Sequence, residues 1–315
     1  MGAAMPGTTT LGTITLGPVL FNWDAEQWRD FHFRMADEAP IASACVGEVV
    51  CAKRAQFFAP YLGAVCERYK AAGKEVVYAT PALATSAAEL KLAHAAVEAA
   101  DEFLIEASDI GVLRLLAGRP HAVGPLVNVY NEDTLAVLAG RGAIRFCLTP
   151  ELPARSLAAL AAGAAALDPA PALEVTVFGR VPLALSARCY HARAKGLHKD
   201  NCEFVCADDP DGLYVETLDE EAFLVVNGTQ VMSETYLDLL GELPLLRAMA
   251  IDRFRLMPHS CDMVEVAHIL RDVLDDKIAH DEGRARLRSV VGGNAFSNGF
   301  FRDREGVGFE ASPNG

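Results

Sequence analysis

The chain has 315 residues, of which 51% are hydrophobic and 22% are charged, a composition typical of folded proteins rather than disordered ones. A chain of this length can bury a large core, so its eight cysteines are not needed as a covalent scaffold. Its 28 basic and 42 acidic residues give a net charge of −14 without any basic run, which argues against nucleic acid or an anionic membrane as partner.

The N-terminal segment of the sequence does not match a secretory or an N-myristoylation signal. The first basic residue is Arg29, whereas a secretory signal begins with a basic segment. Pro6 stands where an N-myristoylation signal needs Ser or Thr. No apolar run reaches the roughly 18 residues of a transmembrane helix. We therefore expect a cytoplasmic protein with no transmembrane segment.

Short β-rich runs alternate along the chain with longer helical patterns. The first three strands are predicted at 13–21, 41–46 and 75–79, and the helices that follow them at 25–36, 54–72 and 86–100. Further along we predict strands at 102–105, 122–127, 144–148, 173–178, 223–226 and 253–257. The helices of this part are predicted at 110–117, 133–139, 155–166, 236–249 and 261–277.

Most predicted strands are continuous apolar runs, which is typical of strands buried on both faces. About eight βα units of roughly 30–35 residues favour an α/β fold of the TIM-like (β/α) barrel type over an open sheet. No glycine fingerprint of a dinucleotide-binding fold follows the first strand. We divide the chain into an N-terminal extension (1–16), a single barrel-like domain (17–300) with an irregular cysteine-bearing insertion near 186–212, and a C-terminal tail (301–315).

Several polar side chains and two cysteines follow the predicted strands, where the chemistry of such barrels is located. They are Cys51, Glu106, Asp109, Asn128, Asn131, Glu151 and Cys189. For each acid, capping of a helix or a salt bridge competes with contact to a substrate. The pattern assigns no catalytic residue.

The eight cysteines divide into two groups. Cys45, Cys66, Cys147 and Cys261 lie among apolar neighbours in predicted strands or helices, so we expect them in the core. The segment SARCYHARAKGLHKDNCEFVC is polar, and it places Cys189, Cys202 and Cys206 in one loop. Disulfides are not expected in a cytoplasmic protein, which leaves metal binding as the preferred interpretation.

The spacing of these cysteines leaves zinc and an iron–sulfur cluster at near even odds. His191 or His198 could complete a local Cys₃His zinc site. An iron–sulfur cluster takes four thiolates, and the fourth can come from far away in the sequence. Cys51 is the best candidate, because it lies at a strand-to-helix junction with Lys53 and Arg54 close enough to favour its thiolate. No C-x₃-C-x₂-C motif of radical S-adenosylmethionine chemistry occurs.

Eight segments between about Gly17 and Gly299 resemble, in order, the UbiV group of the collagenase-like peptidase family. They are LGPVLFNW, GEVVCAKR, FLIEASDIGVLRLL, VNVYNEDTL, RFCLTPEL, PLALSARCYHAR, DNCEFVC and LVVNGTQVMS. The segment SNGFF (Ser297–Phe301) is a variant of the family's terminal motif, and the first sixteen residues have no counterpart that we identify.

The resemblance implies that Cys51, Cys189, Cys202 and Cys206 hold a 4Fe-4S cluster. It implies a heterodimer with a homologous UbiU-like subunit, with a UbiT-like lipid-binding accessory protein in the same pathway. The implied activity is O₂-independent hydroxylation of ubiquinone precursors in anaerobic ubiquinone biosynthesis, with prephenate as the oxygen donor. No H-E-x-x-H or G-x-S-x-G motif supports a literal peptidase.

Two alternatives to a redox subunit remain open at this stage. The first is a non-catalytic scaffold that binds a cluster or zinc and stabilises its partner. Four cysteines saturate a cubane, which suits structural support as well as electron transfer. The second is an RNA-hydroxylating relative of the same family, against which the net charge of −14 speaks.

Overall fold

The structure, a computed structural model, describes residues 12–311, so the predictions about Pro6 and about the outer ends of the extension and the tail lie outside the described residues. Eight parallel strands form a closed barrel. Each strand from β1 to β7 pairs with the next, and β11 pairs with both β7 and β1. The predicted TIM-like barrel is therefore confirmed. Its strands are β1 (Thr13–Leu16), β2 (Ser43–Val46), β3 (Glu75–Ala79), β4 (Leu104–Ala107), β5 (His121–Val123), β6 (Ala143–Leu148), β7 (Ala172–Leu185) and β11 (Arg253–Leu256).

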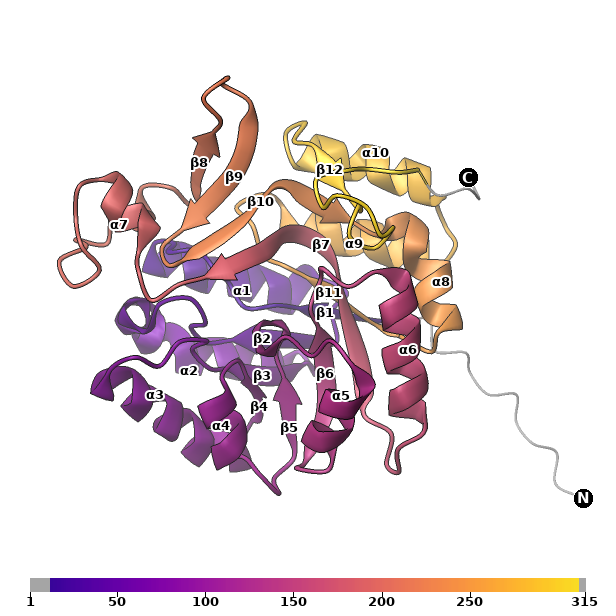
Figure 1. Cartoon of the computed structure of the whole chain (residues 1–315), viewed down its shortest axis with the longest axis horizontal. Coiled ribbons are helices and arrows are strands. Elements are labelled where there is room, and N and C mark those ends of the chain that lie inside the picture. Colours follow the sequence, from indigo (N-terminus) through magenta and orange to yellow (C-terminus); the bar gives the residue numbers. More distant parts are fainter. Residues whose placement is uncertain (1–11, 312–315) are drawn as a thin grey trace, which may run out of the picture.

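Helices cover the outside of the barrel (Figure 1). Polar side chains start several of them, because a side-chain oxygen can accept hydrogen bonds from the first free N–H groups: Asp24, Ser86, Asn131 and Asp262 all do so. Ten helices are described in residues 12–311: α1 (Ala25–Glu38), α2 (Ala55–Ala71), α3 (Ala87–Glu98), α4 (Ile110–Leu115), α5 (Glu132–Ala139), α6 (Ala154–Ala165), α7 (Tyr190–Ala194), α8 (Leu243–Ala248), α9 (Met263–Leu274) and α10 (His280–Val290).

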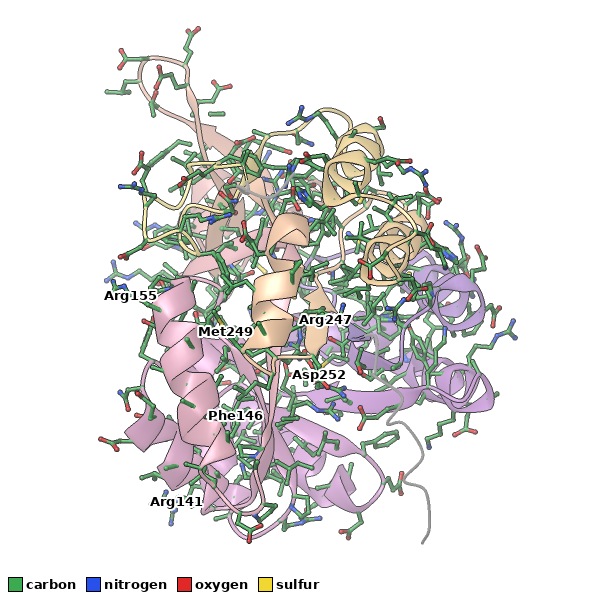
Figure 2. The ribbon with its side chains drawn as sticks, turned by 90° about the vertical axis from the view of Figure 1, so that its right-hand side faces the viewer. Arg141, Phe146, Arg155, Arg247, Met249 and Asp252 are labelled. Atoms are coloured by element: carbon green, nitrogen blue, oxygen red, sulfur yellow. The ribbon has the colours of Figure 1, made fainter. Side chains whose placement is uncertain are left out.

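Two of these helices, α6 and α8, lie side by side on one flank of the barrel (Figures 1 and 2). Phe146 of β6 is fully buried behind them and belongs to the main hydrophobic core. Within residues 12–311 no helix combines the length and the apolarity that crossing a membrane requires.

Strand β7 is long because it belongs both to the barrel and to an antiparallel extension of the same sheet. Its first part is a barrel strand, and from Phe178 onward it pairs antiparallel with β10 (Gln230–Asp238). Gly179 stands where β7 changes partner, with φ of +119° and no room for a side chain against Met257. Beyond β10 the sheet continues through β9 (Ala222–Asn227) to β8 (Leu213–Glu216), and β12 (Phe296–Ser297) pairs with β10.

The structure corrects two sequence-based expectations about this region. The strand at 223–226 is part of β9 and lies outside the barrel. Residues 236–249 do not form one helix, since β10 runs to Asp238 and only α8 follows. The mostly buried residues of β10 pair with β7, β9 and β12, and this tertiary contact overrides the helical pattern.

The proposed domain limits remain a prediction. The first barrel strand begins at Thr13, inside the segment set apart as an extension. Beyond residue 300, Phe301 is buried and its carbonyl accepts a hydrogen bond from the Ala154 N–H at 2.9 Å.

Candidate functional site

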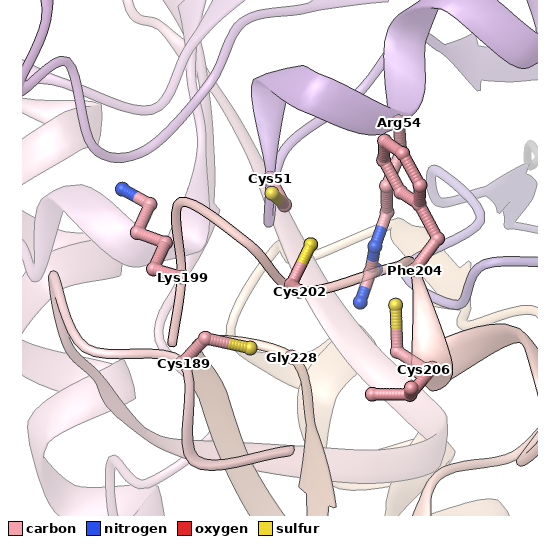
Figure 3. A pocket seen from close by; sticks show the side chains of 9 residues that line it. Cys51, Arg54, Cys189, Lys199, Cys202, Phe204, Cys206 and Gly228 are labelled. Carbon is pink, nitrogen blue, oxygen red and sulfur yellow. The ribbon is translucent and has the colours of Figure 1, made fainter. Parts of the chain in front are cut away.

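Four cysteines from three separate segments line one pocket (Figure 3). Cys51 follows β2, Cys189 immediately precedes α7, and Cys202 and Cys206 lie in the loop between α7 and β8. The insertion near 186–212 thus folds back onto the carboxyl end of β2. Besides the four cysteines, the pocket is lined by Arg54, Lys199, Phe204, Val205 and Gly228.

Hydrogen bonds hold the first segment in place. The buried carboxylate of Glu48 accepts the N–H groups of Val50 and Cys51 at 2.8 and 2.9 Å. The hydroxyl of Thr229 donates to the carbonyl of Val50 at 2.9 Å, which ties this loop to the turn between β9 and β10. Cys51 is therefore positioned by groups that lie far apart in the sequence.

Two of the remaining thiols are also held by polar contacts. The Sγ of Cys189 accepts the N–H of Ala192 at 3.4 Å and caps α7. The side-chain amide of Asn22 donates to the Sγ of Cys206 at 3.4 Å. Such donors stabilise a thiolate more than a neutral thiol, because they place positive charge at the sulfur.

The loop that carries Cys202 and Cys206 has an unusual backbone between them. Glu203 and Phe204 both have positive φ, 50° and 55°, a conformation that non-glycine residues rarely adopt. The ring of Phe204 packs edge-on against Phe57 of α2, with centroids 4.7 Å apart. Contacts of this kind hold the loop in a strained conformation that directs both cysteines into the pocket.

Arg54 is the buried cation of the pocket. Its guanidinium donates to the carbonyl of Leu20 at 2.8 Å and to the side-chain oxygen of Asn227 at 3.0 Å. Burial opposes its charge, but the nearby Glu48 and the cysteines Cys206 and Cys51 raise its pKa. The pocket therefore combines one fixed positive charge with four thiols.

Gly228 lets the guanidinium of Arg54 approach the pocket. Its φ is +61°, and a Cβ there would lie 2.5 Å from an Nη atom of Arg54. Only glycine satisfies both conditions without a shift of the arginine. The turn that contains Gly228 is thus part of the site, although it lies 22 residues beyond Cys206.

Burial raises the pKa of the thiols of Cys51 and Cys189. For Cys51, the charge of Arg54 and a backbone N–H act in the opposite direction. For Cys189, the N–H of Ala192 does the same. In the protein as described, these two thiols are neutral near pH 7, so that binding of a metal would release protons.

The other four cysteines and three basic residues of the insertion lie elsewhere. Cys45 and Cys147 are buried in the barrel strands β2 and β6, and Cys66 is buried in α2, as expected. Cys261 is only partly buried, and it lies beside Met263. Three cationic or potentially cationic side chains of the insertion, Arg188, His191 and His198, do not line the pocket.

Lys53 and His191 have partners of their own. The ammonium group of Lys53 donates to the carbonyl of Lys199 at 2.5 Å, so of the two basic residues expected beside Cys51 only Arg54 lines the pocket. His191 is buried and bonds to the Asp209 carboxylate at 2.8 Å.

The polar residues predicted at the strand ends mainly support the fold. Asp109 and Asn131 accept N–H groups at the starts of α4 and α5. Asn128 ends a 3-10 turn with φ of 60°, and Glu151 accepts a hydrogen bond from the Tyr130 hydroxyl. Glu106 points into the barrel, where it forms an ion pair with Arg255. None of these five residues lines the cysteine pocket.

The four thiols surround a space rather than one point. Within residues 12–311, no three His, Cys, Asp or Glu side chains come together as they would around a single metal ion. Sequence reasoning missed Asn22 and Asn227, because their roles depend on contacts across the fold, and it also missed Glu48, which binds the nearby N–H groups of Val50 and Cys51. The Asn-Gly pair that contains Gly228 is a turn signal, and it could have marked that turn.

Comparison with known proteins identifies one family. The family described as peptidase family U32 matches residues 28–309, nearly the whole chain.

Similar solved structures include thiamine phosphate pyrophosphorylase from Pyrococcus furiosus, with 9% identity, a TM-score of 0.40, and coverage of 86% of this chain and 98% of that one. Tryptophan synthase from M. tuberculosis has 12% identity and a TM-score of 0.40, with coverage of 90% and 91%. A fructose-1,6-biphosphate aldolase described as putative, from Coccidioides immitis, has 11% identity and a TM-score of 0.39, with coverage of 90% and 88%. Similarities this weak carry no argument about chemistry.

Proposed function

The chain belongs to peptidase family U32, and within that family we propose that it is a UbiV-type subunit of an anaerobic hydroxylase. In this proposal it holds a 4Fe-4S cluster on Cys51, Cys189, Cys202 and Cys206. Together with a UbiU-like homologous subunit it supports O₂-independent hydroxylation of ubiquinone precursors in the cytoplasm, with prephenate as oxygen donor. A UbiT-like lipid-binding protein serves the same pathway.

One observation carries the proposal: four cysteines separated by up to 155 positions line the same pocket. The other four cysteines do not line it. Four thiolates are the usual ligand set of a 4Fe-4S cluster, and the fourth ligand is often distant in sequence. The donor set therefore fits the cluster.

The arrangement favours a cluster over a single zinc ion. A structural zinc ion draws its four ligands to one point at about 2.0–2.3 Å. The thiols here surround a wider space, with no three-ligand group around one point among the described residues. Neither histidine of the local Cys₃His alternative lines the pocket, since His191 is bonded to Asp209 and His198 is exposed.

The residues around the pocket suit a negatively charged group. Arg54 supplies a buried positive charge, and the amide of Asn22 donates toward Cys206. When bound, the cluster would supply one-electron transfer, whose potential depends on charge and on hydrogen bonds to sulfur. Arg54 and Asn22 act on both of these quantities.

Anaerobic reconstitution of the purified chain tests the proposal. We expect about four iron and about four sulfide per chain, with broad visible absorbance. Single changes to serine at Cys51, Cys189, Cys202 or Cys206 should lower both contents sharply. Cys261→Ser is the matched control, because this partly buried cysteine does not line the pocket, and it should load as the wild type does. About one zinc per chain without sulfide would contradict the proposal.

A further test separates a redox subunit from a stabilising scaffold. The loaded chain and the UbiU-like subunit would be supplied with a ubiquinone precursor and prephenate under anaerobic conditions, without an added reductant that would itself change the oxidation state of the cluster. A redox role predicts that the cluster changes oxidation state during turnover. A cluster that stays in one oxidation state during turnover would show that it only stabilises the complex.

A further inference from the structure

The hairpin of β8 and β9 projects from the body of the protein (Figure 1). Strand β8 pairs with β9 only, so its outer edge has no strand partner among the described residues. The turn at its tip is well formed: the N–H of Thr217 donates to the carbonyl of Glu221 at 2.9 Å, and the N–H of Glu220 donates to the carbonyl of Thr217 at 3.0 Å. The hairpin is therefore a defined arm.

The arm is acidic. Residues 213–227 contain Glu216, Asp219, Glu220 and Glu221 but no Lys or Arg. All four acidic residues are exposed, and no ion pair of their carboxylates occurs among the residues that the structure covers. Charged residues on a free edge strand protect it from aggregation, which is the simplest explanation of such a pattern.

Two large apolar side chains do not fit that explanation. Leu218 at the tip is 104% exposed, and Phe223 on β9 is 55% exposed. Single exposed apolar residues are common on protein surfaces. Two on one projecting arm, surrounded by unpaired carboxylates, have the composition of a docking surface with an apolar centre and a charged rim.

The base of the arm is part of the cysteine site. Strand β9 leads directly into Gly228, which lines the pocket, and its last residue, Asn227, binds the guanidinium of Arg54. The length of β9 places the tip roughly 20 Å from this base. A protein docked on the arm is therefore held at a fixed position relative to the four thiols.

We propose that the β8–β9 hairpin is the docking arm for a second protein chain whose surface presents an apolar groove rimmed by Lys and Arg. The inference rests on the proposed function, since it takes the UbiU-like subunit as that chain. A second copy of the present chain is a poor occupant, because each copy has a net charge of −14 and the same acidic arm.

Titration of the cluster-loaded chain with purified UbiU-like subunit measures the affinity between them and tests whether the hairpin is the docking site. Leu218→Ala and Phe223→Ala should each weaken binding by about tenfold or more, since side chains that fill apolar pockets dominate interface energies. Val137→Ala is the control: Val137 lies on α5 and is 56% exposed, close to the value of Phe223. It should bind like the wild type. Cluster content and circular dichroism check that all variants are folded and loaded.

A charge variant provides the second readout. The triple change Glu216→Gln, Asp219→Asn and Glu221→Gln should weaken binding at low salt and flatten its salt dependence, because screening acts on the charges that were removed. If all arm variants bind the UbiU-like subunit as tightly as the wild type does, the hairpin is not the docking site, and the proposed function is unaffected. If the wild-type chain itself does not bind the UbiU-like subunit, both the proposed partner and the proposed role of the hairpin are wrong. Self-association of the wild type that Leu218→Ala abolishes would assign the arm to a second copy instead.

Discussion

Arg54 connects the cysteine pocket to the rest of the barrel. Its side chain is almost fully buried, and its guanidinium contacts the carbonyl of Leu20 after β1 and the side chain of Asn227 on β9. The buried carboxylate of Glu48 lies close enough to interact with it electrostatically. Removing one member of such a buried set leaves the others without compensation, so the charge of the pocket is built into the fold.

Gly228→Ala tests this arrangement by adding one carbon atom beside Arg54. The new Cβ would lie 2.5 Å from an Nη atom of Arg54, so the guanidinium must move away from the pocket. We expect most of the reconstituted iron to be lost and stability to fall by about 1–2 kcal/mol from the positive φ. Iron content and urea unfolding measure the two effects.

Gly73→Ala separates the two effects. Gly73 also has positive φ, +72°, but a Cβ there meets nothing within 4 Å. The Gly73→Ala variant should lose stability through the same backbone strain but keep the iron content of the wild type. Equal loss of iron in both variants would mean that contact with Arg54 is not what matters at Gly228.

The sequence alone indicated the four cysteines and, less directly, Arg54. It could not indicate Asn227 or Gly228 as site residues, because they reach the pocket only through the antiparallel extension of β7. For Glu106, near the end of β4, the sequence left a salt bridge and contact with a substrate open. The structure shows the salt bridge: the side chain lies within the barrel and binds Arg255.

At the scale of elements, the barrel strands carry an internal set of ion pairs. Arg255 of β11 contacts Glu106 of β4 and Glu174 of β7, and all three residues are buried. Arg253 of β11 also contacts Glu174, at 3.5 Å. The charge of Arg255, with those of Arg253 and Arg145, lowers the pKa of Glu174 against the opposing effect of burial. These contacts join three strands across the interior.

Arg255→Leu should destabilise the chain by about 3–5 kcal/mol, because it leaves two buried carboxylates without their shared cation. Arg155→Leu is the comparison at the surface, where Arg155 and Asp303 form an exposed ion pair at 2.9 Å. That change should cost less than about 1 kcal/mol. Urea unfolding measures the loss of stability in both variants. Similar losses would show that the buried ion pairs add little to the stability of the fold.

Patterns along the chain predicted the barrel strands and most helices, because buried parallel strands are short apolar runs. They failed where strands mix polar and apolar residues. β8 and β10 are of this kind, and they become strands by pairing with β9 and β7. The polar helix α10 was also missed, since most of its residues face solvent.

At the scale of the whole molecule, four buried histidines make the fold sensitive to acid. They belong to different parts of the chain, and burial lowers the pKa of each: His32, His121, His191 and His259. For His32 the pKa falls from 6.5 to about 3. In His32, His121 and His191 one ring nitrogen has no hydrogen-bond partner among the described residues, whereas the Nδ1 of His259 lies 3.6 Å from the Asp211 carboxylate.

Stability should therefore fall as the pH drops below about 6.5. A lowered pKa means that the unfolded chain binds more protons than the folded one between about pH 3 and pH 6.5, so stability rises with pH across that window. For His32 alone the loss is roughly 2 kcal/mol at pH 5 relative to neutral pH. Urea unfolding of the apoprotein at several pH values measures this loss of stability. The loss between neutral pH and pH 5 should be smaller by that amount in His32→Gln. An identical pH profile in this variant would show that His32 does not titrate as expected.

The proposal that four cysteines hold a cluster is tested most directly by X-ray absorption at the iron edge of the anaerobically reconstituted chain. A 4Fe-4S cluster on Cys51, Cys189, Cys202 and Cys206 predicts a first shell of sulfur alone, together with a clear iron–iron shell. Nitrogen or oxygen ligands without iron–iron scattering would contradict it.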